Sequence, residues 1–131
     1  MDAVAHVTQL VENKDYAAAI VFIDGLPKNE VEATPKLGYF LGLCRFSVGN
    51  HKTAYDGLIE IQKANPAEVS IYYLMGRCQE ELGNTDEAVR IFEACVKMPG
   101  CPKFVGARLS KLKPDHAQGS VNRFQLPTDE T

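Results

Sequence analysis

Residues 37–58 read LGYFLGLCRFSVGNHKTAYDGL, and residues 71–92 read IYYLMGRCQEELGNTDEAVRIF. The two stretches start 34 residues apart, and at this offset small residues align with small residues and large apolar residues with large ones. The aligned pairs are Leu41 with Met75, Gly42 with Gly76, Cys44 with Cys78, Gly49-Asn50 with Gly83-Asn84, Ala54 with Ala88, and Leu58 with Phe92. A fixed offset shared by so many positions indicates an internal repeat.

The residues within each repeat predict a hairpin of two helices. Small residues at helical spacing let two helices approach closely, and the large apolar residues beside them fill the remaining space. The Gly-Asn pairs suit the turn, because both residue types tolerate the left-handed backbone that often ends a helix. Prolines stand at or beside the expected boundaries, where a missing N–H does least harm. The expected helices span 2–12, 15–26, 35–48, 51–64, 69–82, 85–97 and 103–112.

The motifs Leu41-Gly42…Ala54-x3-Leu58…Pro66 and Tyr72-x2-Met75-Gly76…Ala88-x3-Phe92 resemble the tetratricopeptide repeat (TPR) pattern W-x2-L-G-x2-Y…A-x3-F…P at its 34-residue period. The sequence departs from this pattern at a few positions. Gly38 stands where the large aromatic is expected, Arg45 and Gln79 stand at the tyrosine position, and Gly100 replaces the final proline of the later repeat.

The resemblance implies an all-α, right-handed α-solenoid of about three TPR helical hairpins plus a C-terminal capping helix. The TPR domain is expected over 1–112, with repeats at 1–34, 35–68 and 69–102 and the capping helix at 103–112. Residues 113–131 turn polar and are expected to form a flexible tail. The first repeat is degenerate, as terminal repeats often are, and Asp2 is a suitable cap for its first helix.

Composition excludes several classes of function. The chain has 131 residues, of which 45% are hydrophobic, which is typical of one globular domain. Fourteen Lys and Arg against seventeen Asp and Glu give a formal charge of −3, so no overall positive charge favours nucleic acid. We therefore predict no nucleic-acid partner. The sequence also shows no run of about 18 apolar residues, so it predicts no membrane span and a cytoplasmic protein.

No residue cluster in the sequence has the spacing of an active site or a metal site. The four cysteines show no Cys-x2-Cys spacing and, without an export signal, are expected to be reduced. Cys44, Cys78 and Cys95 fall within helices and are predicted to be buried, whereas Cys101 is the one expected to be exposed. Because the three histidines are scattered and no phosphate-binding loop appears, we predict no enzyme activity, no cofactor and no metal.

In TPR proteins the first helix of each pair lines a concave groove that binds ligands. The resemblance therefore implies a groove for a protein or peptide ligand. Its candidate residues are Lys36, Tyr39, Leu43, Phe46, Tyr73, Arg77 and Glu80. Tyrosine and arginine are common anchors in interfaces. Leu43 and Phe46 also fit a second interpretation, in which they only complete the core.

Two further features bear on the ligand. Some TPR proteins grip a chaperone's C-terminal carboxylate with Lys, Asn and Arg, but the matching positions here hold Phe40, Ser70 and Leu74, so this role is not expected. A basic run in the last predicted helix and just beyond it has two interpretations. It is either a solvated end helix or a contact for acidic residues, such as the Glu80-Glu81 surface of another copy. The run comprises Lys103, Arg108, Lys111 and Lys113.

The leading hypothesis from the sequence is a non-catalytic protein–protein interaction adaptor or assembly factor that binds a partner peptide segment in the concave TPR groove. A second hypothesis is a dedicated cytoplasmic chaperone for a secreted or assembly-prone client. The third is a self-associating scaffold, a homo-oligomer in which Phe124 and Leu126 of the tail occupy the groove of the same or another copy.

Overall fold

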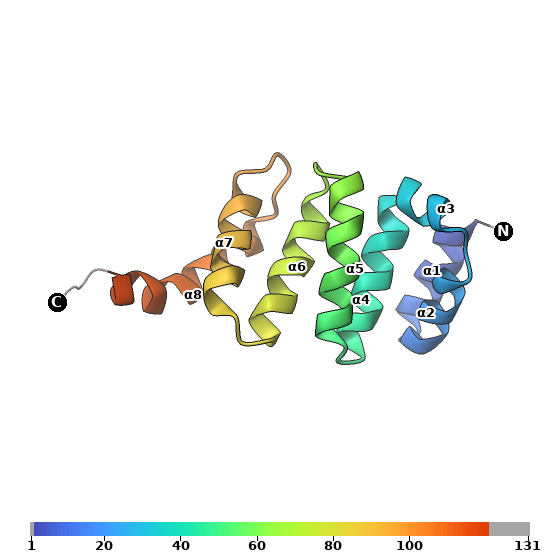
Figure 1. Ribbon diagram of the computed structural model, residues 1–131, viewed down its shortest axis with the longest axis horizontal. Coiled ribbons are helices and arrows are strands. Elements are labelled where there is room, and N and C mark those ends of the chain that lie inside the picture. The colour runs from blue at the N-terminus through green and yellow to red at the C-terminus, as the bar shows by residue number, and fades with distance from the viewer. Residues whose placement is uncertain (1, 121–131) are drawn as a thin grey trace.

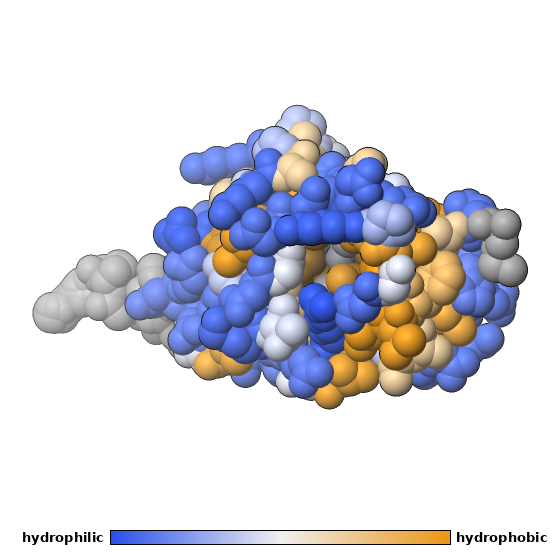
Figure 2. Space-filling model, turned by 45° about the vertical axis from the view of Figure 1, so that its right-hand side comes forward, coloured by the Kyte–Doolittle hydropathy of each residue, from blue (hydrophilic) through white to orange (hydrophobic). Residues whose placement is uncertain are grey.

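The computed structural model describes residues 2–120, with side chains described for residues 2–113. That part of the chain contains eight helices and no strand. The helices are α1 (Ala3–Glu12), α2 (Tyr16–Asp24), α3 (Lys28–Ala33), α4 (Pro35–Ser47), α5 (His51–Ala64), α6 (Val69–Glu81), α7 (Thr85–Val96) and α8 (Lys103–Ser120). Figure 1 shows them side by side in a row that runs from the N-terminal to the C-terminal end. In the turned view of Figure 2, hydrophobic residues gather toward the N-terminal side of the row, and hydrophilic residues cover most of the rest of that face. Helix α1 contacts α2, α4 contacts α5, α6 contacts α7, and α7 contacts α8. The predicted solenoid of three helical hairpins with an additional C-terminal helix is confirmed.

The turns inside the second and third hairpins have the same geometry. Gly49 and Gly83 adopt φ angles of +91° and +84°, in the left-handed region where a glycine carries no steric penalty. The backbone N–H of the following asparagine then donates to a carbonyl five residues earlier, over 2.8 Å in one hairpin and 2.9 Å in the other. In the first hairpin Lys14 takes the corresponding conformation, with φ of +61°. The first repeat therefore keeps the turn but lacks the residue best suited to it.

The aligned glycines explain how closely each pair of helices approaches. A Cβ atom at Gly42 would lie 2.5 Å from Cδ2 of Leu58, and one at Gly76 would lie 2.5 Å from Cε1 of Phe92. Gly38 has the same relation to Ile61, where an added Cβ would lie 2.7 Å from Cγ2. These approaches leave no room for a side chain. The departure at Gly38, where the family has an aromatic residue, is therefore compensated by the isoleucine on α5.

The other two departures from the family pattern have polar partners. Arg45, at a tyrosine position, reaches back to the first repeat, where its Nη2 donates to Oδ1 of Asp24 over 3.2 Å. Gln79, at the second tyrosine position, is buried, and its Oε1 accepts from Nδ2 of Asn84 over 2.7 Å. Both residues thus link their helix to a neighbouring segment through a hydrogen bond.

The largest differences from the expected helices are at α3 and α8. Helix α3 (Lys28–Ala33) was not predicted; it follows Pro27 and buries Val31, so this short segment covers apolar residues between the first two repeats. Helix α8 (Lys103–Ser120) runs past the predicted end at residue 112 and through Pro114, so the backbone of residues 113–120 is helical. A proline removes one helical hydrogen bond but need not end the helix. Residues 121–131, including Phe124 and Leu126, lie outside the described part.

Helix α8 covers the C-terminal end of the core. Val105 and Leu109 are buried against a cluster that contains Ala88, Val89, Phe92 and Cys95 of α7, and Leu112 packs beside them. Phe104 lies on another side of the helix and keeps 56% of its surface exposed. The predicted capping helix therefore closes the core with Val105 and Leu109, and the ring of Phe104 stays largely outside the core.

The cysteines follow the expected division between core and surface. Cys44, Cys78 and Cys95 are fully buried, and Cys101 is partly exposed; all four are free thiols. Burial raises the pKa of Cys44 and raises the pKa of Cys78 and Cys95 to about 12, because the thiolate form loses its hydration in the core. The three buried thiols therefore stay protonated at neutral pH.

This difference predicts the order in which the thiols react. At pH 8 a water-soluble disulfide reagent should label one cysteine of the folded protein rapidly, and that cysteine should be Cys101. The buried thiols should react only after denaturation, since the thiolate is the reactive form and their raised pKa keeps it scarce. Intact mass after a short exposure checks this, with Cys101→Ser as the control. Rapid labelling of two or more sites in the folded protein would contradict the burial.

Candidate partner-binding face

The first helices of successive hairpins lie next to one another on one face of the molecule. Helix α4 contacts both α1 and α6. Helix α6 reaches α8 through two pairs of side chains, Tyr73 with Phe104 and Glu80 with Arg108. We call the surface formed by α4, α6 and α8 the first-helix face. It is the face where the sequence predicted the candidate residues to gather.

Aromatic side chains connect the three helices of this face. The ring of Tyr73 lies 5.0 Å from that of Phe104 in an edge-to-face contact and 5.9 Å from that of the buried Phe92. Tyr39 of α4 is half-buried and packs against the main core cluster. Burial raises the pKa of Tyr39 above its ordinary value, and the neighbouring Tyr73 adds to the rise. Both effects favour a neutral Tyr39. We call Tyr39, Tyr73 and Phe104 the aromatic strip.

A charged network lies beside the aromatic strip. The guanidinium of Arg77 lies 5.2 Å from the ring centre of Phe46, within the range of a cation–π contact. Arg77 also pairs with Glu80 at 3.4 Å and with Glu81 at 3.6 Å. Arg108 on α8 binds both carboxylate oxygens of Glu80, over 2.7 Å and 3.1 Å. A single carboxylate thus lies between two arginines and ties α6 to α8.

Arg77 is held in place without having all its donors used. Its side chain is 23% exposed, and its Nε atom is buried without a hydrogen bond, although it lies 3.4 Å from Glu80. The distance allows an ion-pair attraction, but the N–H direction does not meet the criteria of a hydrogen bond. A buried donor without an acceptor is unfavourable. Because the Nε atom has essentially no accessible surface, a ligand can reach only the exposed part of the Arg77 side chain.

The remaining predicted residues differ in their exposure. Lys36 is exposed at the start of α4. Leu43 and Phe46 are half-buried and pack against the main core cluster, as Tyr39 does. For Leu43 and Phe46 this agrees with the second interpretation, in which they complete the core. Part of each side chain is still exposed to solvent. Binding by any of the seven residues stays a prediction.

The sequence reasoning missed Phe104 and Arg108, which both belong to this face. The signal was present, because Lys36, Ser70 and Phe104 are separated by steps of the same repeat period. Extending the groove positions by one further repeat would have found Phe104. Two residues of the basic run have acidic partners in the same chain. Arg108 pairs with Glu80, and Lys113 pairs with Glu93 at 3.2 Å. An acidic surface on another copy is not needed to explain these two residues.

Neither a metal site nor a membrane span is found in the described residues. No group of three or more His, Cys, Asp or Glu side chains there could hold a metal ion. None of the described helices combines the length and apolar character needed to cross a bilayer.

Comparison with known proteins agrees with the geometry. Residues 12–95 match the profile of the family described as "Anaphase-promoting complex, cyclosome, subunit 3", a TPR-type family. The chain belongs to this TPR family. The match runs from the last residue of α1 to the penultimate residue of α7, so it covers the second and third hairpins almost completely and, of the first hairpin, mainly α2. TPR-type repeats indicate a role in protein–protein interaction, and this family is generally a non-catalytic interaction module.

Two curated relatives show the same repeat. The chain is 30% identical over 101 residues to anaphase-promoting complex subunit 3 of Dictyostelium discoideum, and the aligned region covers 76% of this chain and 10% of that protein. It is 25% identical over 120 residues to a TPR repeat-containing protein of Methanocaldococcus jannaschii, and the aligned region covers 87% of this chain and 21% of that protein. This TPR protein thus spans about a tenth and about a fifth of the length of these relatives.

Proposed function

We propose that this TPR protein is a non-catalytic adaptor or assembly factor that holds a short segment of a partner protein on its first-helix face. The observation that carries the proposal is the exposed ring of Phe104 against Tyr73, on the same face as the partly exposed Arg77. Aromatic residues and arginine dominate the binding energy of protein interfaces when they lie together and can be desolvated. The face offers this combination on three adjacent helices.

The chemistry of the face indicates what kind of segment would fit. The aromatic strip favours a large apolar side chain, which would be buried against Tyr39, Tyr73 and Phe104. The partly exposed, positively charged side chain of Arg77 favours a hydrogen-bond acceptor close to it, such as a backbone carbonyl or a carboxylate. A partner segment that supplies both groups would satisfy the face. Four free thiols support a reducing compartment, in agreement with a cytoplasmic location.

A pull-down with matched variants tests this proposal. The wild-type protein, Phe104→Ala and Val96→Ala are immobilised and exposed to an extract of the source organism. Phe104 and Val96 are both exposed, at 56% and 38%, but Val96 lies on α7 and outside the first-helix face. Partners of the wild type should persist with Val96→Ala and fall about tenfold or more with Phe104→Ala, the loss expected of an interface anchor. Equal recovery of the partners with all three proteins would show that they do not bind on the first-helix face.

A further inference from the structure

Two of the four cysteines lie where α7 leads into α8. Cys95 is buried in the last turn of α7, and Cys101 stands in the loop just before α8 begins. Cys95 belongs to the hydrophobic cluster that α8 closes, and Cys101 packs against the same cluster. Cys44 and Cys78 belong to the main core cluster instead. The fold thus separates the cysteines into two groups.

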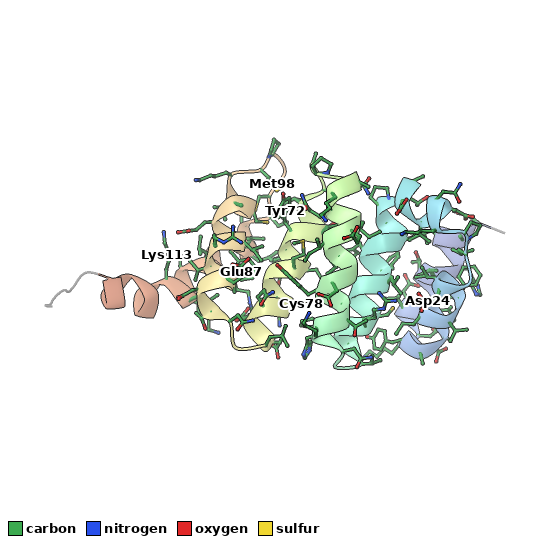
Figure 3. All side chains as sticks on the ribbon, viewed as in Figure 1. Asp24, Tyr72, Cys78, Glu87, Met98 and Lys113 are labelled. Atoms are coloured by element: carbon green, nitrogen blue, oxygen red, sulfur yellow. The ribbon has the colours of Figure 1, made fainter. Side chains whose placement is uncertain are left out.

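The loop between Cys95 and Cys101 consists of two consecutive turns. The N–H of Met98 donates to the carbonyl of Cys95 over 3.0 Å, and the N–H of Cys101 donates to the carbonyl of Met98 over 3.3 Å. Gly100 lets the second turn close, because its φ of +79° is in the left-handed region that favours glycine. Figure 3 shows Met98 of this loop beyond the end of α7, far from Asp24 at the N-terminal end of the row. The two turns bring Cys101 back beside Cys95.

The two thiols are in direct contact. The side chain of Cys101 forms a hydrogen bond with that of Cys95. Burial raises the pKa of Cys95, and the neighbouring Cys101 adds to the rise. Two sulfur atoms in hydrogen-bonding contact reach the length of a disulfide bond, about 2.0 Å, by movement of their side chains alone. The turns and the cluster therefore hold the two sulfur atoms in position to form a bond.

The two thiols differ in their access to solvent. Cys95 has no exposed surface, whereas Cys101 is partly exposed. A small oxidant in solution therefore meets Cys101 first, while Cys95 lies behind it on the core side. The raised pKa of Cys95 keeps its thiolate scarce, so the step that needs this thiolate is the slower one. An accessible thiol beside a second thiol that completes the reaction is the arrangement of redox-sensitive cysteines.

We propose that Cys95 and Cys101 are a thiol modification site, a pair that a small-molecule disulfide such as oxidised glutathione converts into an intramolecular disulfide. The Cys101 thiolate attacks one sulfur of the oxidant, forms a mixed disulfide and releases one glutathione thiolate. The Cys95 thiolate then attacks the sulfur of Cys101, and the second glutathione leaves as a thiolate. Two electrons pass from the pair to the oxidant, and the two glutathione thiolates take up the two protons that the cysteines lose.

The disulfide fixes the start of α8 to the end of α7. Helix α8 carries Phe104 and Arg108, so the bond restrains the helix that completes the first-helix face. A cross-link of this kind stabilises a fold mainly because it restricts the unfolded chain. The protein thus holds its last helix more firmly under oxidising conditions. The reaction needs no bound partner, so this inference does not rest on the proposed function.

Intact mass and peptide mapping test the proposal. The reduced protein is incubated at pH 8 with an excess of oxidised glutathione, and samples are quenched with acid over time. The chain should first gain the mass of one glutathione, on Cys101, and then fall to a mass two hydrogens below that of the reduced chain. Trypsin should release residues 91–97 and 98–103 as one disulfide-linked pair, because Lys97 lies between the two cysteines.

Matched variants assign the two steps. Cys95→Ala should accumulate the mixed disulfide at Cys101, because no second thiol is present to displace the glutathione. Cys78→Ala removes a buried thiol from the other cluster and should form the disulfide as the wild type does. Circular dichroism at 222 nm shows that each variant is folded.

Thermal unfolding tests the effect on α8. The oxidised wild type should melt roughly 5 °C above the reduced protein, the shift expected when a disulfide closes a short loop. Cys101→Ser should melt at the same temperature with and without the oxidant. An oxidised wild type that melts no higher than the reduced protein would show that the bond does not fix α8.

Two results of the mass analysis would overturn the proposal. One is a glutathione adduct that persists in the wild type, and the other is a disulfide that includes Cys44 or Cys78. Either result would leave the proposed function of the first-helix face standing, since no partner takes part in these measurements. Failure of the Phe104→Ala pull-down would equally leave the thiol pair untouched, so the two proposals fail separately.

Discussion

Replacing Phe92 with alanine should lower the free energy of unfolding by about 3–5 kcal/mol, the usual cost of removing a fully buried aromatic ring. Phe92 has no exposed surface, and its ring lies directly over Gly76 in the contact between α6 and α7. Its removal would leave a cavity that the two helices cannot close without shifting. Urea denaturation followed by circular dichroism at 222 nm measures this loss, which is a large part of the roughly 5–15 kcal/mol of a typical domain.

Two further variants show whether the loss of stability comes from the buried packing of Phe92 or from the removal of any aromatic ring. Phe104→Ala removes the same ring from a site that is 56% exposed, so it should cost no more than about 1 kcal/mol. Gly76→Ala introduces a Cβ 2.5 Å from Phe92 and should cost about 1–3 kcal/mol, with a smaller cost when Phe92→Ala is also present. A Phe92→Ala protein as stable as Phe104→Ala would contradict the packing described for the repeat.

Replacing Tyr73 with alanine should weaken binding of the partner segment by at least about tenfold, equivalent to about 1.4 kcal/mol. Tyr73 is the residue that joins the aromatic strip, since its ring contacts both Phe92 and Phe104. Truncation removes a contact surface for the ligand and the support of Phe104. Isothermal titration calorimetry with the partner segment identified by the pull-down gives the change in Kd.

Controls for Tyr73→Ala must exclude a folding defect. Tyr55→Ala removes a half-buried tyrosine from α5, outside the first-helix face, and should leave the Kd unchanged. Tyr73→Phe keeps the ring and should retain most of the affinity. Helicity at 222 nm should be the same for all the proteins. Wild-type affinity in a folded Tyr73→Ala protein would remove the aromatic strip from the binding account.

The repeat could be predicted from the sequence because its determinants are local and recur. Gly42 and Gly76 each face a large residue sixteen positions later, Leu58 and Phe92, and the turn glycines Gly49 and Gly83 recur at the same offset. Each small residue is needed where a large side chain of the next helix packs against it. The recurring pairs of small and large residues therefore indicate which helices are in contact. The burial of Cys44, Cys78 and Cys95 followed from the same periodicity.

Other features depend on contacts that the repeat pattern does not contain. Arg45 binds Asp24, a residue of the preceding repeat, and no local rule pairs these two positions. Helix α3 lies between repeats and is too short for a periodic signal. The continuation of α8 through Pro114 runs against the usual expectation that proline ends a helix.

The candidate site was predicted only in part. The positions on α4 and α6 follow from the family resemblance, and the structure brings Phe46, Arg77 and Glu80 together. The contribution of α8 was missed because the last helix was treated only as a cap. Once Phe104 and Arg108 lie against Tyr73 and Glu80, the end helix also becomes part of the candidate site.

The most direct test of the proposed function maps the bound partner segment on the protein by amide NMR. If the partner segment binds on the first-helix face, the largest shifts occur in α4, α6 and α8, around Tyr39, Tyr73 and Phe104. The changes in α5 and α7 are then small. Shifts that concentrate on α5 and α7, while those three residues stay unchanged, would show that the partner binds elsewhere and would contradict the account.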